Sequence, residues 1–293
     1  MSAVAGAATE ARPIGLLGGV RNFALYLAAC LFVGFGLFPL YMMITTSLKT
    51  DQQAFAWPPV WLFEPTFHSY YNALFVFGGR SVDTYVINSL LVTLVSSALA
   101  VFLGAMAAYG LARFRFRGNR DIAFFILSTR FAPPVGFIVP IYLMVQRSGL
   151  LDNQLALIIV YTSMNLSFVT WIMRGFFIEI PIEIEEAALV DGASRWYAFR
   201  TILLPLSRTG ILAVMIIVFA FDWAEFLFAF ILTATPQAMT FPVGVQGLVT
   251  QFEIIWNDMA AAGAIAMLLP LVLMVLARRH VVTGLTFGVV REK

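Results

Sequence analysis

The stretch Val86–Ala112 reads VINSLLVTLVSSALAVFLGAMAAYGLA and contains no charged side chain. A helix needs about 20 residues, at about 1.5 Å of rise each, to cross the hydrocarbon core of a bilayer. Because lipid offers no hydrogen-bond partners, a backbone that crosses it must pair its own polar groups, and a helix does so within one segment. The stretch therefore predicts a membrane-spanning helix, since its length and continuous apolar character disfavour a strand.

Five further stretches of this kind lie at 23–46, 122–146, 154–176, 209–233 and 259–277. The chain of 293 residues is 61% hydrophobic and only 12% charged, whereas soluble domains carry about 25% charged residues. The predicted fold class is an all-α polytopic membrane protein with six transmembrane helices. We expect a membrane domain over residues 23–278, between short tails at 1–22 and 279–293.

Arginine and lysine are distributed unevenly over the two sides of the predicted membrane domain. The tails and the loops at 113–121 and 177–207 contain most of the 18 basic residues, whereas the opposite loops contain Lys49, Arg80 and Arg147. Short loops rich in Lys and Arg usually stay in the cytoplasm. We therefore expect both termini on the cytoplasmic side.

The two long loops on the other side, 47–85 and 234–258, are rich in proline and aromatic residues, including Trp57, Trp61 and Trp256. Trp and Tyr are enriched where a membrane meets water. Two interpretations stay open here: anchoring at that interface, and docking of an external partner.

The predicted cytoplasmic loop at 177–207 is long and carries several helix signals. Pro181 suits a first helical position, and the glutamates after it suit the positive end of a helix. Gly192 can end that helix in a left-handed conformation, and Ser194 can cap a second helix that Pro205 stops. The resulting helix–turn–helix either lies on the bilayer or fits a second protein. Its acidic residues favour a protein, because cytoplasmic leaflets are anionic.

The same loop carries a family resemblance. Glu186-Ala187-Ala188, Gly192 and Ile202-Leu203-Leu204-Pro205 follow the spacing EAA-x3-G-x9-I-x-L-P, which resembles the EAA motif of ABC importer membrane subunits. Further segments resemble the carbohydrate-importer branch, with Ala224 where that branch has Asn; they are 58–66, 88–90, 113–118, 223–227 and 284–286. The resemblance covers nearly all of the chain after residue 22 and points to the smaller, six-span subunit of maltose-type importers.

This resemblance implies a type I ABC importer permease fold with a cytoplasmic coupling helix, in the bacterial cytoplasmic (inner) membrane. The implied partners are a sister permease in a heterodimer, two ATP-binding subunits, an external solute-binding protein and membrane lipid. The implied solute is an oligosaccharide, disaccharide or polyol, and the chain is then a transporter subunit and not an enzyme. The residues expected to couple it to the ATP-binding subunits are Glu186, Ala187, Ala188, Asp191, Gly192, Ala193, Leu204 and Pro205.

Motifs for nucleotides and metals are missing from the sequence. A P-loop needs a lysine directly after a glycine, and neither Lys49 nor Lys293, the only lysines, follows one. His68 and His280 are predicted on opposite membrane faces, and no HExxH or CxxC pattern occurs. A net charge of +2 is too small to suggest nucleic acid. We expect no cofactor in this chain and Mg-ATP on partner ATPase subunits.

Two other classes of function fit a polytopic protein. A stand-alone secondary transporter would use intramembrane charges for proton coupling, but a self-sufficient carrier needs no loop that fits an ATPase. An intramembrane enzyme would need a nucleophile–base pair or a metal motif, which the sequence lacks. The loop at 177–207 therefore favours an ATP-driven importer that works by alternating access.

Three charged residues fall inside predicted spans: Arg130, Asp222 and Glu225. A charge at the bilayer centre costs about 2.5–3.5 kcal/mol on insertion scales, so it usually faces a partner or water. Asp222 and Glu225 are three residues apart and would share one helix face, with Trp223 between them. Asp222, Trp223 and Glu225 are candidates for the translocation path or a solute site. A structural ion pair or hydrogen bond is the alternative for the two carboxylates.

Arg130 is followed in the same predicted span by Pro133, Pro134 and Pro140. Prolines interrupt a helix and free backbone carbonyl groups, which is tolerated in a membrane where they line a cavity. We expect all three prolines to break the third span. Arg130, Pro133 and Pro134 are thus candidate gate or structural residues, and for Arg130 a structural pairing is the favoured interpretation.

Overall fold

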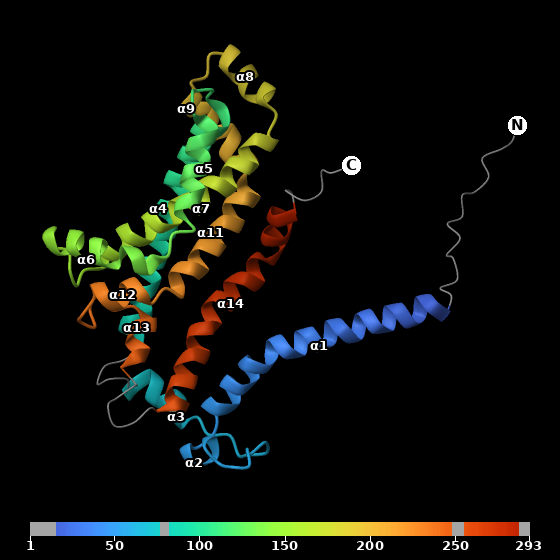
Figure 1. Ribbon diagram of the computed structural model, residues 1–293, viewed down its shortest axis with the longest axis vertical. Helices are drawn as coiled ribbons and strands as arrows, with labels where there is room; N and C mark the ends of the chain where they lie inside the picture. Colours follow the sequence, from blue (N-terminus) through green and yellow to red (C-terminus); the bar gives the residue numbers. More distant parts are fainter. Residues whose placement is uncertain (1–15, 77–81, 248–254, 287–293) are drawn as a thin grey trace, which may run out of the picture.

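The computed structural model of the protein describes residues 16–76, 82–247 and 255–286. Within those ranges all regular structure is helical (Figure 1). In chain order the helices and short helical turns are α1 (Leu16–Ser47), α2 (Asp51–Ala54), α3 (His68–Tyr71), η1 (Asn72–Val76), α4 (Val82–Arg113), α5 (Asn119–Thr129), η3 (Pro134–Phe137), α6 (Ile138–Arg147), α7 (Gln154–Glu179), α8 (Ile182–Val190), α9 (Arg195–Ala198), η4 (Phe199–Leu203), α10 (Leu204–Leu206), α11 (Arg208–Trp223), α12 (Leu227–Leu232), α13 (Phe241–Gln246) and α14 (Trp256–Thr286).

Four of these helices are long and apolar enough to cross a membrane: α1 from Asn22 onward, α4, α7, and α14 as far as Leu276. They agree with the expected spans at 23–46, 86–112, 154–176 and 259–277. Two more pairs of helices qualify only if each pair is taken as one bent span. The described part of the chain thus offers four spans, or up to six.

The third expected span, 122–146, is broken. The helical segment Pro134–Arg147 leaves α5 at an angle of 94°. Pro133 and Pro134 lie at this break, as expected, because Pro133 has an extended backbone with ψ of 125° and proline has no N–H to continue the helix. The expectation for Pro140 is wrong. This residue lies in the first turn of α6, where backbone N–H groups have no partner within the helix anyway.

The fifth expected span, 209–233, is interrupted as well. α11 ends at Trp223, and α12 begins only at Leu227. The expectation that Asp222 and Glu225 share the face of one helix is therefore wrong, because only Asp222 belongs to α11.

The body of the molecule is built on α4 and α7, which pack against each other, with α11 against both and α14 against α11 (Figure 1). Gly104 allows α4 and α7 to approach closely, because a Cβ atom there would lie 2.6 Å from Val169 Cγ1. Large side chains such as Phe177 and Phe199 are completely buried in this core. Burying one such side chain contributes about 1.5–3 kcal/mol.

α1 departs from this body (Figure 1). Met43, near its C-terminal end, lies against Gly263 of α14, but the apolar window of its span has 0% of its residues buried. Phe32 and Phe35 are 80% and 82% exposed. An apolar surface of this extent needs lipid or another protein around it.

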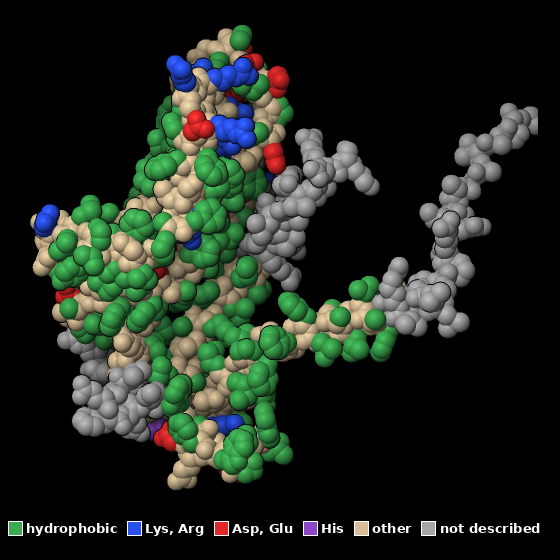
Figure 2. Space-filling view, viewed as in Figure 1, with side chains coloured by type: hydrophobic (Ala, Val, Ile, Leu, Met, Phe, Trp, Pro, Cys, Tyr) green, Lys and Arg blue, Asp and Glu red, His purple; other side chains and the backbone are tan. Residues whose placement is uncertain are grey.

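The molecule has two distinct ends: α8 and α9 form one, and α2 and α3 form the other (Figure 1). Lys and Arg side chains gather at the α8–α9 end, whereas hydrophobic side chains cover much of the middle (Figure 2). This division suits a protein whose apolar middle lies in a membrane and whose two ends lie outside it.

Candidate functional site

The loop 181–205 forms the helix–turn–helix that its sequence predicts. Pro181 lies at the N-cap of α8, one position earlier than expected. Gly192 has a φ of +88°, a left-handed conformation that glycine adopts without steric cost. Ser194 caps α9, because its hydroxyl accepts a hydrogen bond of 3.1 Å from the Tyr197 amide.

The end of this loop differs from expectation. The prediction that Pro205 stops the second helix is wrong, because helical turns continue through η4 and α10 to Leu206. The segment Arg195–Leu206 then bends by 77° into α11. The break falls at Ser207, which is buried.

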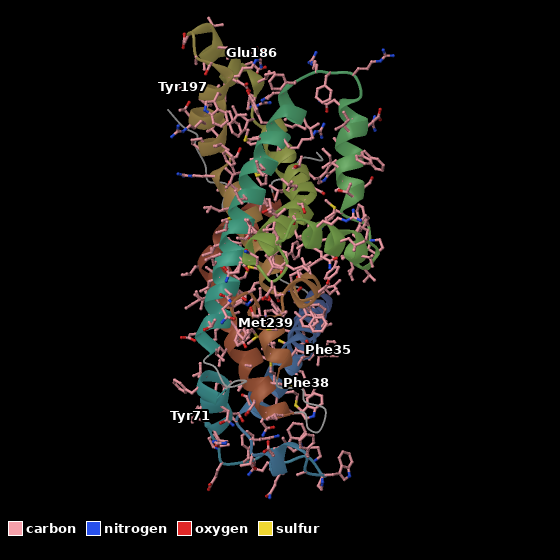
Figure 3. The ribbon with its side chains drawn as sticks, turned by 90° about the vertical axis from the view of Figure 1, so that its left-hand side faces the viewer. Phe35, Phe38, Tyr71, Glu186, Tyr197 and Met239 are labelled. Carbon is pink, nitrogen blue, oxygen red and sulfur yellow. The ribbon has the colours of Figure 1, made fainter. Side chains whose placement is uncertain are left out.

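The face of α8 that carries the EAA residues points away from the molecule. Glu186 and Ala187 are exposed, and Glu186 lies at the extreme end of the structure, near Tyr197 (Figure 3). The other expected coupling residues are exposed (Asp191, Gly192, Pro205) or half-buried (Ala188, Ala193, Leu204). A second protein can reach this surface without any rearrangement of the chain.

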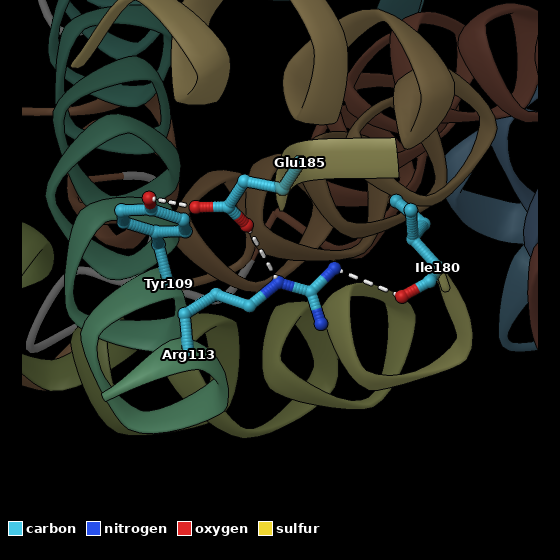
Figure 4. Close-up of polar contacts among 4 residues, drawn as sticks. All are labelled: Tyr109, Arg113, Ile180 and Glu185. Carbon is cyan, nitrogen blue, oxygen red and sulfur yellow. Dashed lines mark hydrogen bonds and ion pairs between the residues drawn. The ribbon is translucent and has the colours of Figure 1, made fainter. Parts of the chain in front are cut away.

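Glu185, directly before the EAA residues, points the opposite way and is only 3% exposed. Its Oε2 accepts a hydrogen bond of 2.9 Å from Arg113 Nε, and its Oε1 accepts one from the Tyr109 hydroxyl (Figure 4). Arg113 also donates from Nη2 to the carbonyl oxygen of Ile180 at 2.9 Å. The last residue of α4 therefore holds both α8 and the segment that precedes it.

This ion pair was not predicted from the sequence. Arg113 and Glu185 are 72 positions apart, and no local pattern encodes their contact. The available signals in the sequence were an arginine at the end of an apolar span and an acidic run in the loop 177–207. A buried pair is tolerated only when both charges are matched and hydrogen-bonded, and the contacts of Tyr109 and Ile180 meet that condition.

A cavity of about 480 Å³ lies where the breaks of the third and fifth spans face α7. It is called the cavity below. Its lining residues are Thr129, Arg130, Ala132, Pro134, Phe137, Ile141, Tyr161, Met164, Asn165, Ala220, Phe221, Asp222, Ala224, Glu225 and Phe228. Four candidates from the sequence analysis thus meet here: Arg130, Pro134, Asp222 and Glu225.

Glu225 is half-buried and lines the cavity just before α12. Its Oε2 accepts a hydrogen bond of 2.7 Å from the Tyr161 hydroxyl. The amides of Phe228 and Ala229 donate to its two oxygens at 3.0 and 3.3 Å. These amides belong to the first turn of α12, whose N–H groups lack intrahelical partners. The carboxylate therefore stabilises the start of α12 while it borders the cavity.

Asp222 is 5% exposed, and both oxygens of its carboxylate accept hydrogen bonds. It accepts hydrogen bonds from Ser96 Oγ at 2.7 Å, Ser97 Oγ at 3.3 Å and Asn165 Nδ2 at 2.6 Å. These contacts connect α11 to α4 and α7. Three donors offset the cost of burying the carboxylate, so Asp222 has a structural role in the wall of the cavity.

Arg130 follows α5 directly and has no carboxylate partner among the described residues. Its Nη1 donates to the carbonyl oxygen of Met164 at 3.3 Å. Its guanidinium carbon lies 5.1 Å from the ring centroid of Phe221 and 5.9 Å from that of Phe168, within the range of cation–π attraction.

Trp223 turns away from the cavity and does not line it. Its Nε1 donates to the carbonyl oxygen of Ala266 in α14 at 3.1 Å, and its ring stacks on Phe219 at a centroid distance of 5.8 Å. Pro134 lines the cavity, whereas Pro133 does not.

Asp152, between α6 and α7, fixes the loop after α12. Its Oδ1 accepts hydrogen bonds from the amides of Ala234 and Thr235 at 2.8 and 2.9 Å, and its own amide donates to Leu232 at 2.8 Å. Burial acts to raise the pKa of Asp152, but the hydrogen bonds from the amides of Ala234 and Thr235 and from the Thr235 side chain together lower this pKa below its ordinary value.

The groups in the loop 181–205 and in the cavity are suited to binding other molecules. Among the described residues, no group of three or more His, Cys, Asp or Glu side chains could hold a metal ion. The loop 181–205 presents a protein-sized surface, and the cavity combines hydrogen-bonding groups with aromatic rings, as ligand pockets do.

A family model described as "Binding-protein-dependent transport system inner membrane component" matches residues 100–286. The chain is 37% identical over 255 residues to the probable ABC transporter permease protein y4oR of Sinorhizobium fredii, covering 87% of this chain and 90% of that protein. It is 34% identical over 264 residues to the trehalose transport system permease protein SugB of Mycobacterium tuberculosis, covering 89% and 94%.

A solved structure has the same fold. It is a bacterial ABC transporter involved in the import of the acidic polysaccharide alginate, with a TM-score of 0.72 and 20% sequence identity over 89% of this chain and 96% of that one.

Proposed function

The chain belongs to the family of binding-protein-dependent transport system inner membrane components, and from this premise we propose that it is one of two membrane-spanning subunits of an ATP-driven carbohydrate importer. It is a multi-pass inner-membrane permease of the carbohydrate-importer branch and not an enzyme. We propose further that it has six membrane spans, that it pairs with a sister permease and two ATP-binding subunits, and that the loop 177–207 couples it to those subunits. The solute class is an oligosaccharide, disaccharide or polyol; the trehalose permease among its relatives supports this class.

One observation carries this proposal: α8 is exposed on one face, and on the other face it is held by a buried ion pair. Glu186 and Ala187 point outward, whereas Glu185 is paired with Arg113 at the end of α4. A helix that only packed on its own subunit would bury its apolar alanines. We propose that this face fits a groove on an ATP-binding subunit, and that α8 is the coupling helix.

The same end of the molecule carries the gathered Lys and Arg side chains (Figure 2). The positive-inside rule then favours a cytoplasmic position for α8, α9 and both termini. Mg-ATP binds to the partner subunits in this proposal, and two such subunits serve the heterodimer of permeases.

The apolar surface of α1 supports a sister permease. This helix leaves the body of the molecule with its span unburied, so its side chains are available to lipid and to a second membrane subunit. The opposite end, with α2, α3 and the loop after α12, is then external and available to a solute-binding protein.

The translocation path runs, in this proposal, beside the broken third and fifth spans. Irregular backbone at membrane depth is tolerated where it lines a cavity, and the cavity lies at both breaks. Of the candidate residues, Glu225 borders the path, and Asp222 with Trp223 supports the wall.

Co-purification tests this proposal. The tagged chain is expressed with the second permease and the ATP-binding protein of the same importer. Ala187→Arg places a long cation on the exposed face of α8, and we expect it to remove the ATP-binding protein from the complex while membrane insertion stays normal. Gln52→Arg, on exposed α2 at the other end, is the control and should change nothing. Equal recovery of the ATP-binding protein with both variants would contradict the proposal.

A further inference from the structure

We propose that the loop 114–120, which joins α4 to α5, binds the headgroup of an anionic phospholipid through Arg115, Arg117 and Arg120. It is called the arginine loop below. The inference goes beyond the proposed importer function, because this surface recognises the membrane and neither the solute nor the ATP-binding subunit. Its evidence is a fixed group of exposed arginines beside an exposed apolar helix face.

The arginine loop carries positive charge that its own residues do not balance. Arg115, Arg117 and Arg120 are exposed. None of them has a carboxylate partner within the described part of the chain, where the one ion pair is the buried pair at the end of α4. Asp121 follows in the first turn of α5, so three arginines and one aspartate leave residues 114–121 with a net charge of +2. The loop is therefore suited to an anionic ligand.

A second element adds to this charge. Arg195, the first residue of α9, is exposed. Its guanidinium carbon lies 5.0 Å from the ring centroid of Phe114, within the range of cation–π attraction. The fold thus brings a further arginine to the arginine loop from a distant part of the sequence, at the end of the molecule where Lys and Arg side chains gather (Figure 2).

The backbone of the arginine loop has a fixed shape. Asn119 Nδ2 donates to the carbonyl oxygens of Leu111 and Phe114 at 3.1 and 2.8 Å. Leu111 lies in the last turn of α4, where carbonyl groups lack partners within the helix. Gly118 then turns the chain into α5 with a φ of +83°, which glycine adopts without steric cost. Because these contacts hold the loop in place, its arginines lose less freedom when a ligand binds.

An apolar surface continues from the arginines along α5. This helix packs on α7 with Ala123 buried, whereas Phe124 is 67% exposed. Arg120 and Phe124 are four residues apart and share one face of the helix, about 6 Å apart along its axis. A phospholipid has the same order of groups, since its acyl chains follow its phosphate.

The sign of the charge distinguishes the arginine loop from α8 at the same end of the molecule. The exposed residues of α8 include Glu183 and Glu186, which suit a protein partner because anionic lipid repels them. The arginine loop has the opposite sign and directly follows a membrane span, and cytoplasmic leaflets are rich in anionic lipid. Guanidinium groups also bind phosphate oxygens through paired hydrogen bonds. An anionic phospholipid therefore fits this loop better than an ATP-binding subunit does.

Photo-crosslinking in the assembled importer tests this proposal. The complex is placed in nanodiscs with equal amounts of phosphatidylglycerol and phosphatidylcholine that have identical acyl chains. The photoreactive p-benzoylphenylalanine replaces Phe124 and captures the neighbouring lipid, and mass spectrometry of the adducts gives the ratio of the two lipids. The variants are Arg117→Gln and the triple variant Arg115→Gln/Arg117→Gln/Arg120→Gln. Arg147→Gln, exposed at the end of α6, is the control.

We expect phosphatidylglycerol adducts to exceed phosphatidylcholine adducts about fivefold or more, since one arginine near an anionic surface contributes about that factor. Arg117→Gln should lower this ratio, the triple variant should bring it close to equality, and Arg147→Gln should leave it unchanged. If the triple variant does not assemble, Arg117→Gln decides.

Equal adducts of both lipids without any arginine substitution, a ratio that the arginine variants leave unchanged, or crosslinks to the ATP-binding subunit in place of lipid would overturn the lipid surface. Recovery of the ATP-binding protein is measured on the same samples. If it is normal in that case, the proposed importer function stands without the lipid surface. A complex that never recruits an ATP-binding protein would instead overturn the importer function, and the ratio of lipid adducts would still test the arginine loop.

Discussion

Arg113 Nε lies 2.9 Å from Glu185 Oε2, and the two side chains are only 5% and 3% exposed. This buried ion pair joins the last residue of α4, a membrane span, to α8, the helix at the cytoplasmic end in our proposal. Because the pair is enclosed, salt and water weaken it much less than a surface pair. A displacement of α8 is thus expected to move the end of α4 with it.

The pair should be required for a folded subunit. Glu185→Ala leaves the Arg113 guanidinium buried without a counter-charge, which costs about 3–5 kcal/mol. We expect a lower yield and a lower melting temperature of the purified protein in detergent. Glu186→Ala, at the exposed neighbouring position, is the matched control and should leave both unchanged.

The double variant Arg113→Met/Glu185→Met sharpens this test. Replacing a buried pair by apolar residues is often neutral, so the double variant should be more stable than Glu185→Ala. If Glu185→Ala and Glu186→Ala behave alike, the pair does not hold α8.

The turn at Gly192 should matter for partner binding. A residue with a Cβ atom costs about 1–2 kcal/mol in the left-handed region, and Gly192 has a φ of +88°. Gly192→Ala should therefore distort the turn between α8 and α9 and reduce co-purification of the ATP-binding protein. Gly175→Ala is the control, because Gly175 has ordinary φ and no atom within 4 Å of an added Cβ. Equal loss in both variants would show that the turn geometry is not the cause.

Glu225 should affect transport through both shape and charge. Glu225→Gln keeps one acceptor oxygen, which can serve either the Phe228 amide or the Tyr161 hydroxyl with the Ala229 amide, so uptake should fall only in part. Glu225→Ala removes every acceptor and should abolish most uptake. If both variants instead reduce the yield of assembled complex equally, Glu225 acts only in structure.

Asp152 gives a pH prediction. The pKa of Asp152 is lowered in the folded protein, so its stabilisation is present above the ordinary pKa of about 3.9 and is lost as the pH falls through the folded value. Between pH 7 and pH 5 the loop at 232–235 should therefore keep the same protection from hydrogen exchange, after correction for intrinsic rates.

Asp152→Asn should reduce that protection at pH 7, because a neutral amide is a weaker acceptor than a carboxylate. Asn tolerates the φ of +59° at this position, so the backbone should not change. Unchanged exchange of the Ala234 and Thr235 amides would contradict the role of the carboxylate.

Local signals explain which elements the sequence could predict. Long apolar runs are sufficient to place α1, α4, α7 and α14, because lipid forces each run into a helix. The loop 181–205 was also readable, since Gly192 and Ser194 act on neighbouring residues. Pro133 and Pro134 predicted the break of the third span for the same reason.

Contacts between distant residues explain what could not be predicted. No proline or glycine directly follows Trp223, so no local signal predicts the interruption there. It is stabilised by the hydrogen bond from the Tyr161 hydroxyl of α7 to Glu225. The pairing of Arg113 with Glu185 depends on how α4 packs near α8, and this packing cannot be predicted from the spacing of apolar residues. Asp222 and Glu225 are both acidic residues of the fifth expected span, and the contacts with their partners give them different roles.

ATP-dependent uptake tests the central claim most directly. The complete importer is reconstituted in proteoliposomes with its binding protein outside, and uptake of labelled trehalose, maltose and a polyol is measured with ATP inside and no ion gradient. We predict uptake of at least one of these solutes that requires ATP and is lost with Ala187→Arg. Uptake by this chain alone, driven by an imposed proton gradient without an ATP-binding subunit, would contradict the account.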